Sequence, residues 1–189
     1  MKNIAIFASG EGTNAQNIID YFKSSTQIKI ALVVSNKPSA NVLKRAKQDD
    51  VATLIINRES FYESDETINT LKSANIDLIV LAGFLWMIPE SLIKAFPNKI
   101  INIHPALLPK FGGEGMYGMH VHNAVVEAKE KESGISIHYV NEYYDEGKII
   151  SQHTCILSSM DTPEMVAKKI HQLESEFFPK AIEKLINSF

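Results

Sequence analysis

The residues best suited to chemistry are an asparagine and a histidine two positions apart, Asn102 and His104, in the run Asn-Ile-His-Pro-Ala-Leu-Leu-Pro. They lie at the end of an apolar, strand-like segment, and side chains two apart on a strand share a face. An asparagine amide can donate hydrogen bonds to an oxyanion, and a histidine can carry a proton near neutral pH. The pair therefore predicts a site that stabilises developing negative charge while it moves a proton.

A carboxylate is the natural third member of such a site, and Asp145 is the candidate. It lies in a turn, Tyr-Tyr-Asp-Glu-Gly-Lys, between the last two predicted strands. There it could orient the imidazole, favour its charged form and hold a water. Both parts also have structural interpretations, since an Asn/His pair can simply end a strand and an Asp-Glu-Gly turn is common.

A second candidate site is the glycine-containing loop Ser9–Asn14, which follows the first predicted strand and opens the first helix. Glycine permits close backbone approach, and free N–H groups at a helix start attract an anion, so the loop predicts a phosphate site. The alternative is a tight turn without a ligand. Gly10-x-Gly12-x-x-Ala15 matches a dinucleotide fingerprint formally, but the second strand lacks the expected acidic residue. Lys37 could instead meet a 2′-phosphate, so NADP binding stays an alternative. The Walker pattern is absent, because no Gly-Lys-Ser/Thr follows the loop. A site for a phosphate monoester fits the loop best.

Over the first hundred residues, short apolar runs alternate with segments whose apolar residues have helical spacing. This order predicts a doubly wound, mostly parallel α/β sheet. The strands expected there span 3–8, 28–34, 52–56, 77–82 and 99–103, and the helices span 14–22, 41–48, 65–73 and 89–95. After a loop over 105–118 we expect a helix over 120–129, strands over 134–140 and 148–156 that extend the sheet, and a C-terminal helix from 161 to about 185.

Composition narrows the functional classes. The chain has 189 residues with a hydrophobic fraction of 45%, enough to bury a real core in a single domain. A net charge of −3 with scattered cations argues against nucleic acid, and no apolar run is long enough for a membrane span. The single cysteine, Cys155, indicates a reducing compartment, so we expect a cytoplasmic protein. His120 and His122 would point in different directions on a helix, and we expect no metal site.

Taken together, the motifs resemble the glycinamide ribonucleotide formyltransferases, the purine-biosynthetic members of the folate-dependent formyltransferase family. The Asn-x-His-Pro-x-Leu-Leu-Pro string is specific to formyl transfer from folate, and the Gly-x-Gly-Thr-Asn loop favours the purine branch. A chain of this length also leaves no room for the extra domains of the tRNA-directed enzymes or the formyltetrahydrofolate hydrolases. The segments that carry the resemblance are Ser9–Asn14, Val80–Phe84, Asn102–Lys110, Gly134–His138, Asp145 and Glu174.

The resemblance implies two small-molecule substrates, 10-formyltetrahydrofolate and glycinamide ribonucleotide, and a monomer or homodimer. By the same resemblance, Asn102 and His104 stabilise a tetrahedral intermediate and Asp145 assists proton transfer. Residues 1–100 would form the phosphate-binding half of one domain, and residues 101–189 its catalytic and folate-binding half. The remaining roles implied are phosphate binding by Gly12, Thr13 and Asn14, ribose binding by Glu174, and a folate slot formed by Leu81, Phe84, Leu85, Trp86, Ile88 and Asn141.

Two departures from the family pattern matter. Trp86 stands where the family often has an arginine, which bears on how the glutamate tail of the folate is held. The loop over 111–118 is longer than in the shortest relatives, and we expect either a mobile lid or a plain surface connection. Three other functions stay open: a formyltetrahydrofolate hydrolase, an NADP-binding module, and a formylase for another aminated sugar nucleotide.

Overall fold

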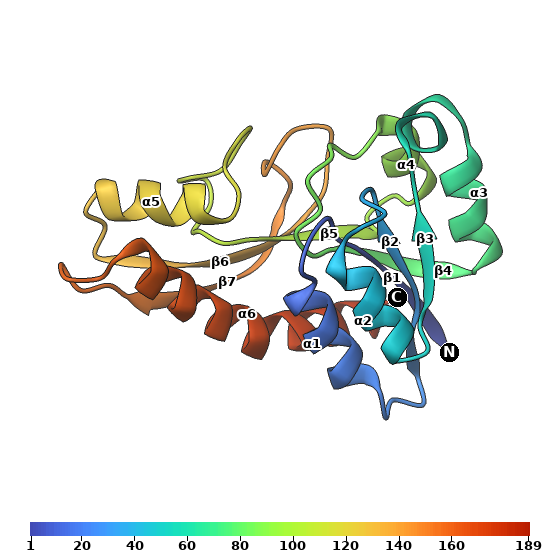
Figure 1. Ribbon diagram of the computed structural model, residues 1–189, viewed down its shortest axis with the longest axis horizontal. Coiled ribbons are helices and arrows are strands. Elements are labelled where there is room, and N and C mark those ends of the chain that lie inside the picture. Colours follow the sequence, from blue (N-terminus) through green and yellow to red (C-terminus); the bar gives the residue numbers. More distant parts are fainter. The chain divides into compact units, whose positions relative to one another are not determined.

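A computed structural model describes residues 1–189 and contains one seven-stranded sheet in the order β3-β2-β1-β4-β5-β6-β7 (Figure 1). The strands are β1 (Lys2–Phe7), β2 (Ile28–Ser35), β3 (Ala52–Ile55), β4 (Ile76–Leu81), β5 (Ile100–His104), β6 (Glu132–Tyr139) and β7 (Ile149–Ile156). The helices are α1 (Thr13–Phe22), α2 (Asn41–Gln48), the π-helix η1 (Glu59–Glu63), α3 (Glu66–Ser73), α4 (Glu90–Ala95), α5 (Met119–Glu127) and α6 (Pro163–Ile186). The predicted mostly parallel α/β class, with late strands extending the sheet and a C-terminal helix, is confirmed.

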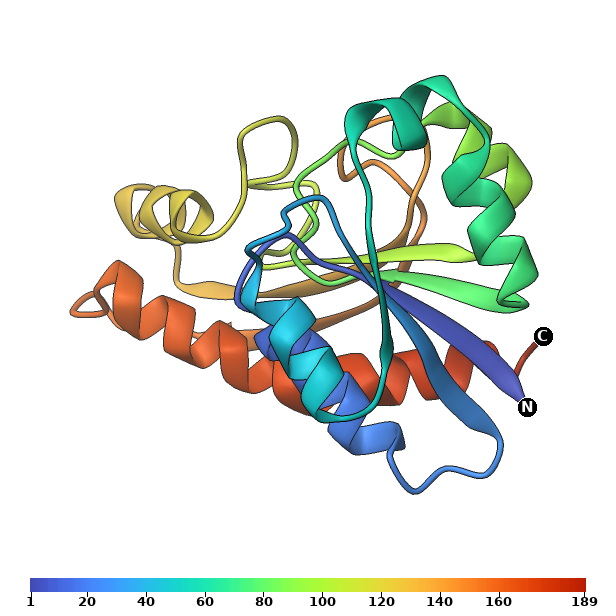
Figure 2. The ribbon, with the colours of Figure 1, turned by 45° about the vertical axis from the view of Figure 1, so that its right-hand side comes forward.

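The chain divides into two compact units, and each is described by itself. The first, Met1–Ile101 with Ser188–Phe189, contains the parallel pairs β1–β2, β1–β4 and β2–β3. Its central strands are fully buried from Ile4 to Phe7 and from Leu78 to Val80, as expected where helices cover both faces of a parallel sheet. Helices α1 and α2 lie side by side beside these strands (Figures 1 and 2). This arrangement leaves the loops after the strands to hold polar residues.

The second unit, Asn102–Asn187, contains the antiparallel pair β6–β7 with α5 and α6 packed together and α6 against both strands. Helix α6 begins as its sequence predicts: Thr162 caps it by accepting from the Met165 N–H, Pro163 follows, and Glu164 lies in the first turn. Its buried stripe includes Val166, Ile170 and Phe178. None of the helices combines the length and apolar character that crossing a membrane requires.

Every predicted helix and strand is present, with ends that differ from the prediction by at most two residues. The one unpredicted element is η1, a five-residue π-helix whose Ser60 Oγ accepts from the Asn57 N–H, while Asn57 Oδ1 accepts from the Ser60 N–H. Its buried Phe61 contacts the rings of Phe7 and Phe84. Because the position of η1 depends on aromatic packing distant in sequence, local periodicity does not reveal it. The single-domain organisation stays a prediction.

Candidate active site

His104 ends β5 and lies almost wholly buried, 3% exposed, between two hydrogen-bond acceptors. Its Nε2 lies 2.7 Å from the carbonyl oxygen of Phe111, so this nitrogen carries a proton that it donates. Its Nδ1 lies 3.3 Å from Oδ2 of Asp145. The structure thus brings together the histidine and the carboxylate that the sequence predicted as partners, although 41 positions separate them in the chain (145 − 104).

Asn102 shares this cluster with His138 of β6, a residue to which no role was assigned from the sequence. The His138 Nδ1–H donates to the Tyr139 carbonyl at 2.8 Å, which leaves Nε2 to face the site. Asn102 Nδ2 lies 3.2 Å from that Nε2 and 3.4 Å from Oδ1 of Asp145. In its neutral form His138 accepts from the Asn102 amide, so it orients the side chain proposed to act on an oxyanion. Alternation along the strand did not reveal whether His138 faces the site, since that requires the register of β6.

Asp145 is the centre of the cluster and is held from four directions. Besides Asn102, His104 and His138, its Oδ2 accepts from the Gly113 N–H at 3.0 Å. Its φ is +56°, a left-handed conformation that aspartate tolerates better than most residues. Phe111, whose carbonyl accepts the hydrogen bond from His104 Nε2, also has a φ of +56°. Strained backbone at two neighbours of one histidine is typical of functional sites.

The environment shifts the pKa of both catalytic candidates downward. Burial lowers the pKa of His104, while the Asp145 carboxylate and the Phe111 carbonyl oppose the shift. For Asp145, burial favours the neutral acid, but His138, His104 and the Gly113 N–H together hold the pKa of the carboxyl below its ordinary value. At neutral pH the carboxylate is therefore charged, and the imidazole has a smaller tendency to be protonated than in water.

A buried serine fixes the chain that follows His104. Ser136 Oγ donates to the Ala106 carbonyl at 2.7 Å and accepts from the Leu108 N–H at 2.9 Å and from Gln152 Nε2 at 2.8 Å. Gln152 Nε2 also lies 3.0 Å from the Leu108 carbonyl oxygen. The Leu108–Pro109 peptide bond is cis. The buried position of Ser136 and its hydrogen bond with Gln152 were not predicted, because polar residues on a strand usually indicate an outward face.

The predicted phosphate loop lies in the first unit and has the backbone that such a site needs. Gly12 is the N-cap of α1 with φ +73°, and no side chain caps that helix start. Ser9 fixes the beginning of the loop. Its Oγ donates to Asn36 Oδ1 at 2.7 Å and accepts from the Leu85 N–H at 2.9 Å. Thr13 is exposed and Asn14 is half-buried. Phosphate binding by Gly12, Thr13 and Asn14 stays a prediction.

The predicted folate residues divide by exposure. Leu81 and Ile88 belong to the buried core, and Leu85 is exposed. Phe84 and Trp86 join an aromatic cluster with Phe61, and the Arg58 guanidinium lies 5.4 Å from the Trp86 ring centroid. A cation therefore accompanies the tryptophan that replaces the family's arginine. Asn141, in the second unit, accepts from the Tyr143 N–H at 3.1 Å and shapes the turn before Asp145.

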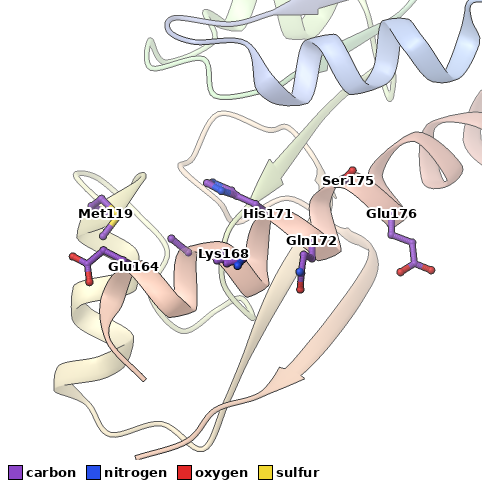
Figure 3. Close-up of a pocket in the computed structure, with 8 residues that line it drawn as sticks. Met119, Glu164, Lys168, His171, Gln172, Ser175 and Glu176 are labelled. Atoms are coloured by element: carbon purple, nitrogen blue, oxygen red, sulfur yellow. The ribbon is translucent and has the colours of Figure 1, made fainter. Parts of the chain in front are cut away.

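One further feature of the second unit was not predicted. A groove of about 580 Å³ follows α6 and is completed by Met119 at the start of α5 (Figure 3). Its lining mixes acidic, basic and imidazole groups: Glu164, Ala167, Lys168, His171, Gln172, Ser175 and Glu176. Glu174, the residue predicted to bind the ribose, is buried on α6.

The His-x-His pair behaves as helix geometry predicts. His120 is exposed and contacts the Tyr117 ring, whereas His122 is buried and its Nδ1 has no hydrogen-bond partner. The two imidazoles thus point apart, as residues two positions apart on a helix do.

Comparison with known proteins shows the family of the chain. Residues 2–182 match the family model described as formyl transferase, so the chain belongs to the formyl transferase family. More particularly, it is 35% identical over 191 residues to the phosphoribosylglycinamide formyltransferase of Bacillus subtilis, covering 98% of this chain and 95% of that one. The crystal structure of phosphoribosylglycinamide formyltransferase from Bacillus halodurans has a TM-score of 0.87 at 36% identity, covering 98% of this chain and 95% of that chain.

Some relatives are longer than this chain. The chloroplastic phosphoribosylglycinamide formyltransferase of Arabidopsis thaliana is 37% identical over 187 residues, and the match covers 96% of this chain but 64% of the relative. In the trifunctional purine biosynthetic protein adenosine-3 of Drosophila melanogaster, also 37% identical, the match covers 98% of this chain and 14% of that protein.

Proposed function

We propose that this chain transfers the formyl group of 10-formyltetrahydrofolate to the amine of glycinamide ribonucleotide. The observation that carries the proposal is the convergence of Asn102, His104 and Asp145, with Asp145 within 3.3 to 3.4 Å of the other two. Membership of the formyl transferase family supports the reaction class. The acceptor substrate is supported by the name of the Bacillus subtilis relative, most of whose length is covered by the match.

In the proposed reaction the neutral amine of the ribonucleotide attacks the formyl carbon, and the formyl oxygen becomes an oxyanion. Asn102 donates an N–H to that oxygen. His104 supplies positive charge near it in the protonated form, in which Nδ1–H faces Asp145 and Nε2–H stays on the Phe111 carbonyl. Collapse of the intermediate breaks the bond to the folate nitrogen, which leaves with a proton. The proton lost by the attacking amine balances the one gained by the folate. Asp145 orients His104 and supports the transfer of the proton.

The distances suggest which hydrogen of Asn102 turns to the substrate. The Asn102 amide lies closer to His138 Nε2, at 3.2 Å, than to Asp145 Oδ1, at 3.4 Å. The longer contact is near the limit of a useful hydrogen bond, so it is the easier one to exchange for an oxyanion. His138 would then keep the side chain in place during the reaction.

The other assignments follow from the family resemblance and from local chemistry. Gly12, Thr13 and Asn14 would bind the phosphate of the ribonucleotide, and Glu174 its ribose. The family resemblance assigns Phe84, Leu85 and Asn141 to pterin binding. Because Arg58 is the cation next to Trp86, we assign it to a carboxylate of the folate's glutamate tail.

The decisive assay measures release of tetrahydrofolate from 10-formyltetrahydrofolate with and without glycinamide ribonucleotide. We expect release only with the ribonucleotide, together with one equivalent of formylated product. Equal release in its absence would mean a hydrolase. Activity with an aminated sugar nucleotide in place of the ribonucleotide would identify a different acceptor, and saturable NADP binding without formyl release would leave only the nucleotide-binding alternative.

A further inference from the structure

The loop assigned to phosphate is tied on its outer side to helix α2 through three residues, Asn41, Val42 and Arg45. The Arg45 Nε–H donates to the Glu11 carbonyl at 2.8 Å, and the Val42 N–H donates to the Gly10 carbonyl at 3.1 Å. Asn41 Nδ2 lies 2.8 and 3.0 Å from the two carboxylate oxygens of Glu11. We infer that this α2 brace, with Arg45 as its principal positioning residue, sets the direction of the loop N–H groups that receive the phosphate. The inference rests on the proposed function.

The geometry of the peptide bond makes the link. A carbonyl and the N–H that follows it belong to one trans peptide plane and point in opposite directions. When α2 holds the Glu11 carbonyl, the Gly12 N–H must point away from α2. Holding the Gly10 carbonyl fixes the Glu11 N–H in the same way. Two successive N–H donors are therefore oriented before any ligand arrives, which reduces the cost of ordering them on binding.

The close approach of α2 also explains why Gly12 must be glycine. A Cβ on Gly12 would lie 2.5 Å from Val42 Cβ and 2.8 Å from Val42 Cα, closer than such atoms approach. Gly12 also has a φ of +73°, which favours glycine on backbone grounds alone. The loop and α2 thus form one packed unit rather than a flexible loop beside a helix.

The brace further restrains an acidic side chain at a site meant for an anion. A free carboxylate at Glu11 would repel a phosphate. The Asn41 side-chain amide donates to both carboxylate oxygens of Glu11, and so holds the negative charge of Glu11 against α2. We expect Glu11→Gln to strengthen binding of a phosphate monoester a few-fold, since it removes the repulsion and keeps a partner for Asn41.

The test compares Arg45→Ala and Arg45→Lys with Lys44→Ala, a matched control that removes one positive charge from an exposed, adjacent position on α2. The first measurement needs no activity: the NMR order parameter of the Gly12 amide in the full chain. We expect it to fall in both Arg45 variants and to stay unchanged in Lys44→Ala. Arg45→Lys keeps the charge but loses the fixed Nε–H geometry, so it separates positioning from electrostatic attraction.

The second measurement is kinetic. We expect Arg45→Ala to raise KM for glycinamide ribonucleotide about tenfold, the size of one charge-assisted hydrogen bond, with kcat and KM for the folate donor within about twofold of the parent. A Gly12 amide as rigid in Arg45→Ala as in the parent, or equal KM values in Arg45→Ala and Lys44→Ala, would overturn the inference. If the parent shows no ribonucleotide-dependent activity, the proposed function fails, and the Gly12 order parameters still decide whether α2 is a brace.

Discussion

Asn102 is the residue whose loss should affect the reaction most selectively. Its side-chain amide contacts His138 and Asp145. We expect Asn102→Ala to lower kcat about a hundredfold or more, because an oxyanion donor is typically worth ~3–4 kcal/mol in the transition state. KM for the ribonucleotide should change little, since the interaction forms mainly as charge develops.

The comparison for Asn102 is Asn123→Ala, an exposed asparagine on α5 in the same unit. Steady-state kinetics of both variants, with unfolding midpoints to show that each is folded, decide the matter. A kcat for Asn102→Ala within threefold of the control would remove this residue from the catalytic group.

His122 is a buried imidazole whose titration should appear in stability rather than in catalysis. Burial, with further contributions from His171 and His104, lowers its pKa to about 4. In the unfolded chain the same group titrates near pH 6.5. Between these values the unfolded chain binds the proton and the folded chain does not. Stability from this residue is therefore complete above about pH 6.5 and is lost as the pH falls toward 4.

We expect His122 to account for about 2 kcal/mol of the fall in unfolding free energy between pH 7.5 and pH 4.5. Urea unfolding at both pH values measures this fall, which should be smaller by about 2 kcal/mol in His122→Gln than in the parent. The matched variant is His120→Gln, two positions away and exposed, which should keep the parent's pH dependence. The same fall in His122→Gln as in the parent would contradict the assignment.

At the scale of elements, the turn between β6 and β7 is the part on which the site depends most. Gly147 is buried in this turn, and a Cβ there would overlap the carbonyl oxygen of Tyr139. That carbonyl accepts from His138, and Asp145 lies two residues before the glycine. A larger residue must therefore move the turn, and both site residues with it.

We expect Gly147→Ala to reduce kcat at least tenfold and to destabilise the fold by about 1–3 kcal/mol, the usual cost of overpacking. Glu146→Ala changes the neighbouring, exposed residue and should leave both quantities near those of the parent. Kinetics and urea unfolding of the pair provide the check. Parent-like values for Gly147→Ala would show that the turn relaxes without disturbing Asp145.

The elements themselves were predictable because their signals are local. Apolar runs revealed β1 and β4, which are buried on both faces, and Thr162-Pro163-Glu164 revealed the start of α6. The Asn102 and His104 pair was predictable for the same reason, since two positions on one strand share a face.

The rest of the site depends on contacts that no local pattern encodes. Ser136 is polar yet buried, because its hydroxyl has three hydrogen-bond partners. It donates to one backbone carbonyl and accepts from one backbone N–H of the chain after β5, and it also accepts from the Gln152 amide. His138 faces Asp145 only because of the register of β6 and the turn that follows. The groove on α6 requires Met119 from another helix. Such features follow from packing between segments, which spacing along the sequence does not contain.

At the scale of the whole molecule, the net charge of −3 constrains how the two proposed substrates, both anionic, would reach their sites. The mean field of the protein does not attract them, so binding must rely on local donors such as the Gly12 region and Arg58. Long-range steering would make association fall steeply with ionic strength, whereas short-range contacts are screened much less. Binding of the ribonucleotide should therefore depend weakly on ionic strength but should be inhibited by anions that resemble its phosphate.

We expect kcat/KM for glycinamide ribonucleotide to fall less than about threefold when sodium chloride rises from about 10 to 150 mM, conditions that shorten the screening length from roughly 30 to 8 Å. Inorganic phosphate at matched ionic strength should instead raise KM for the ribonucleotide without affecting KM for the folate donor, because it competes for the loop N–H groups. Steady-state kinetics in the two salt series measures both effects. A steep fall with chloride alone would indicate steering by a charged surface, and competition by phosphate against the folate donor would place the phosphate site elsewhere than at Gly12, Thr13 and Asn14.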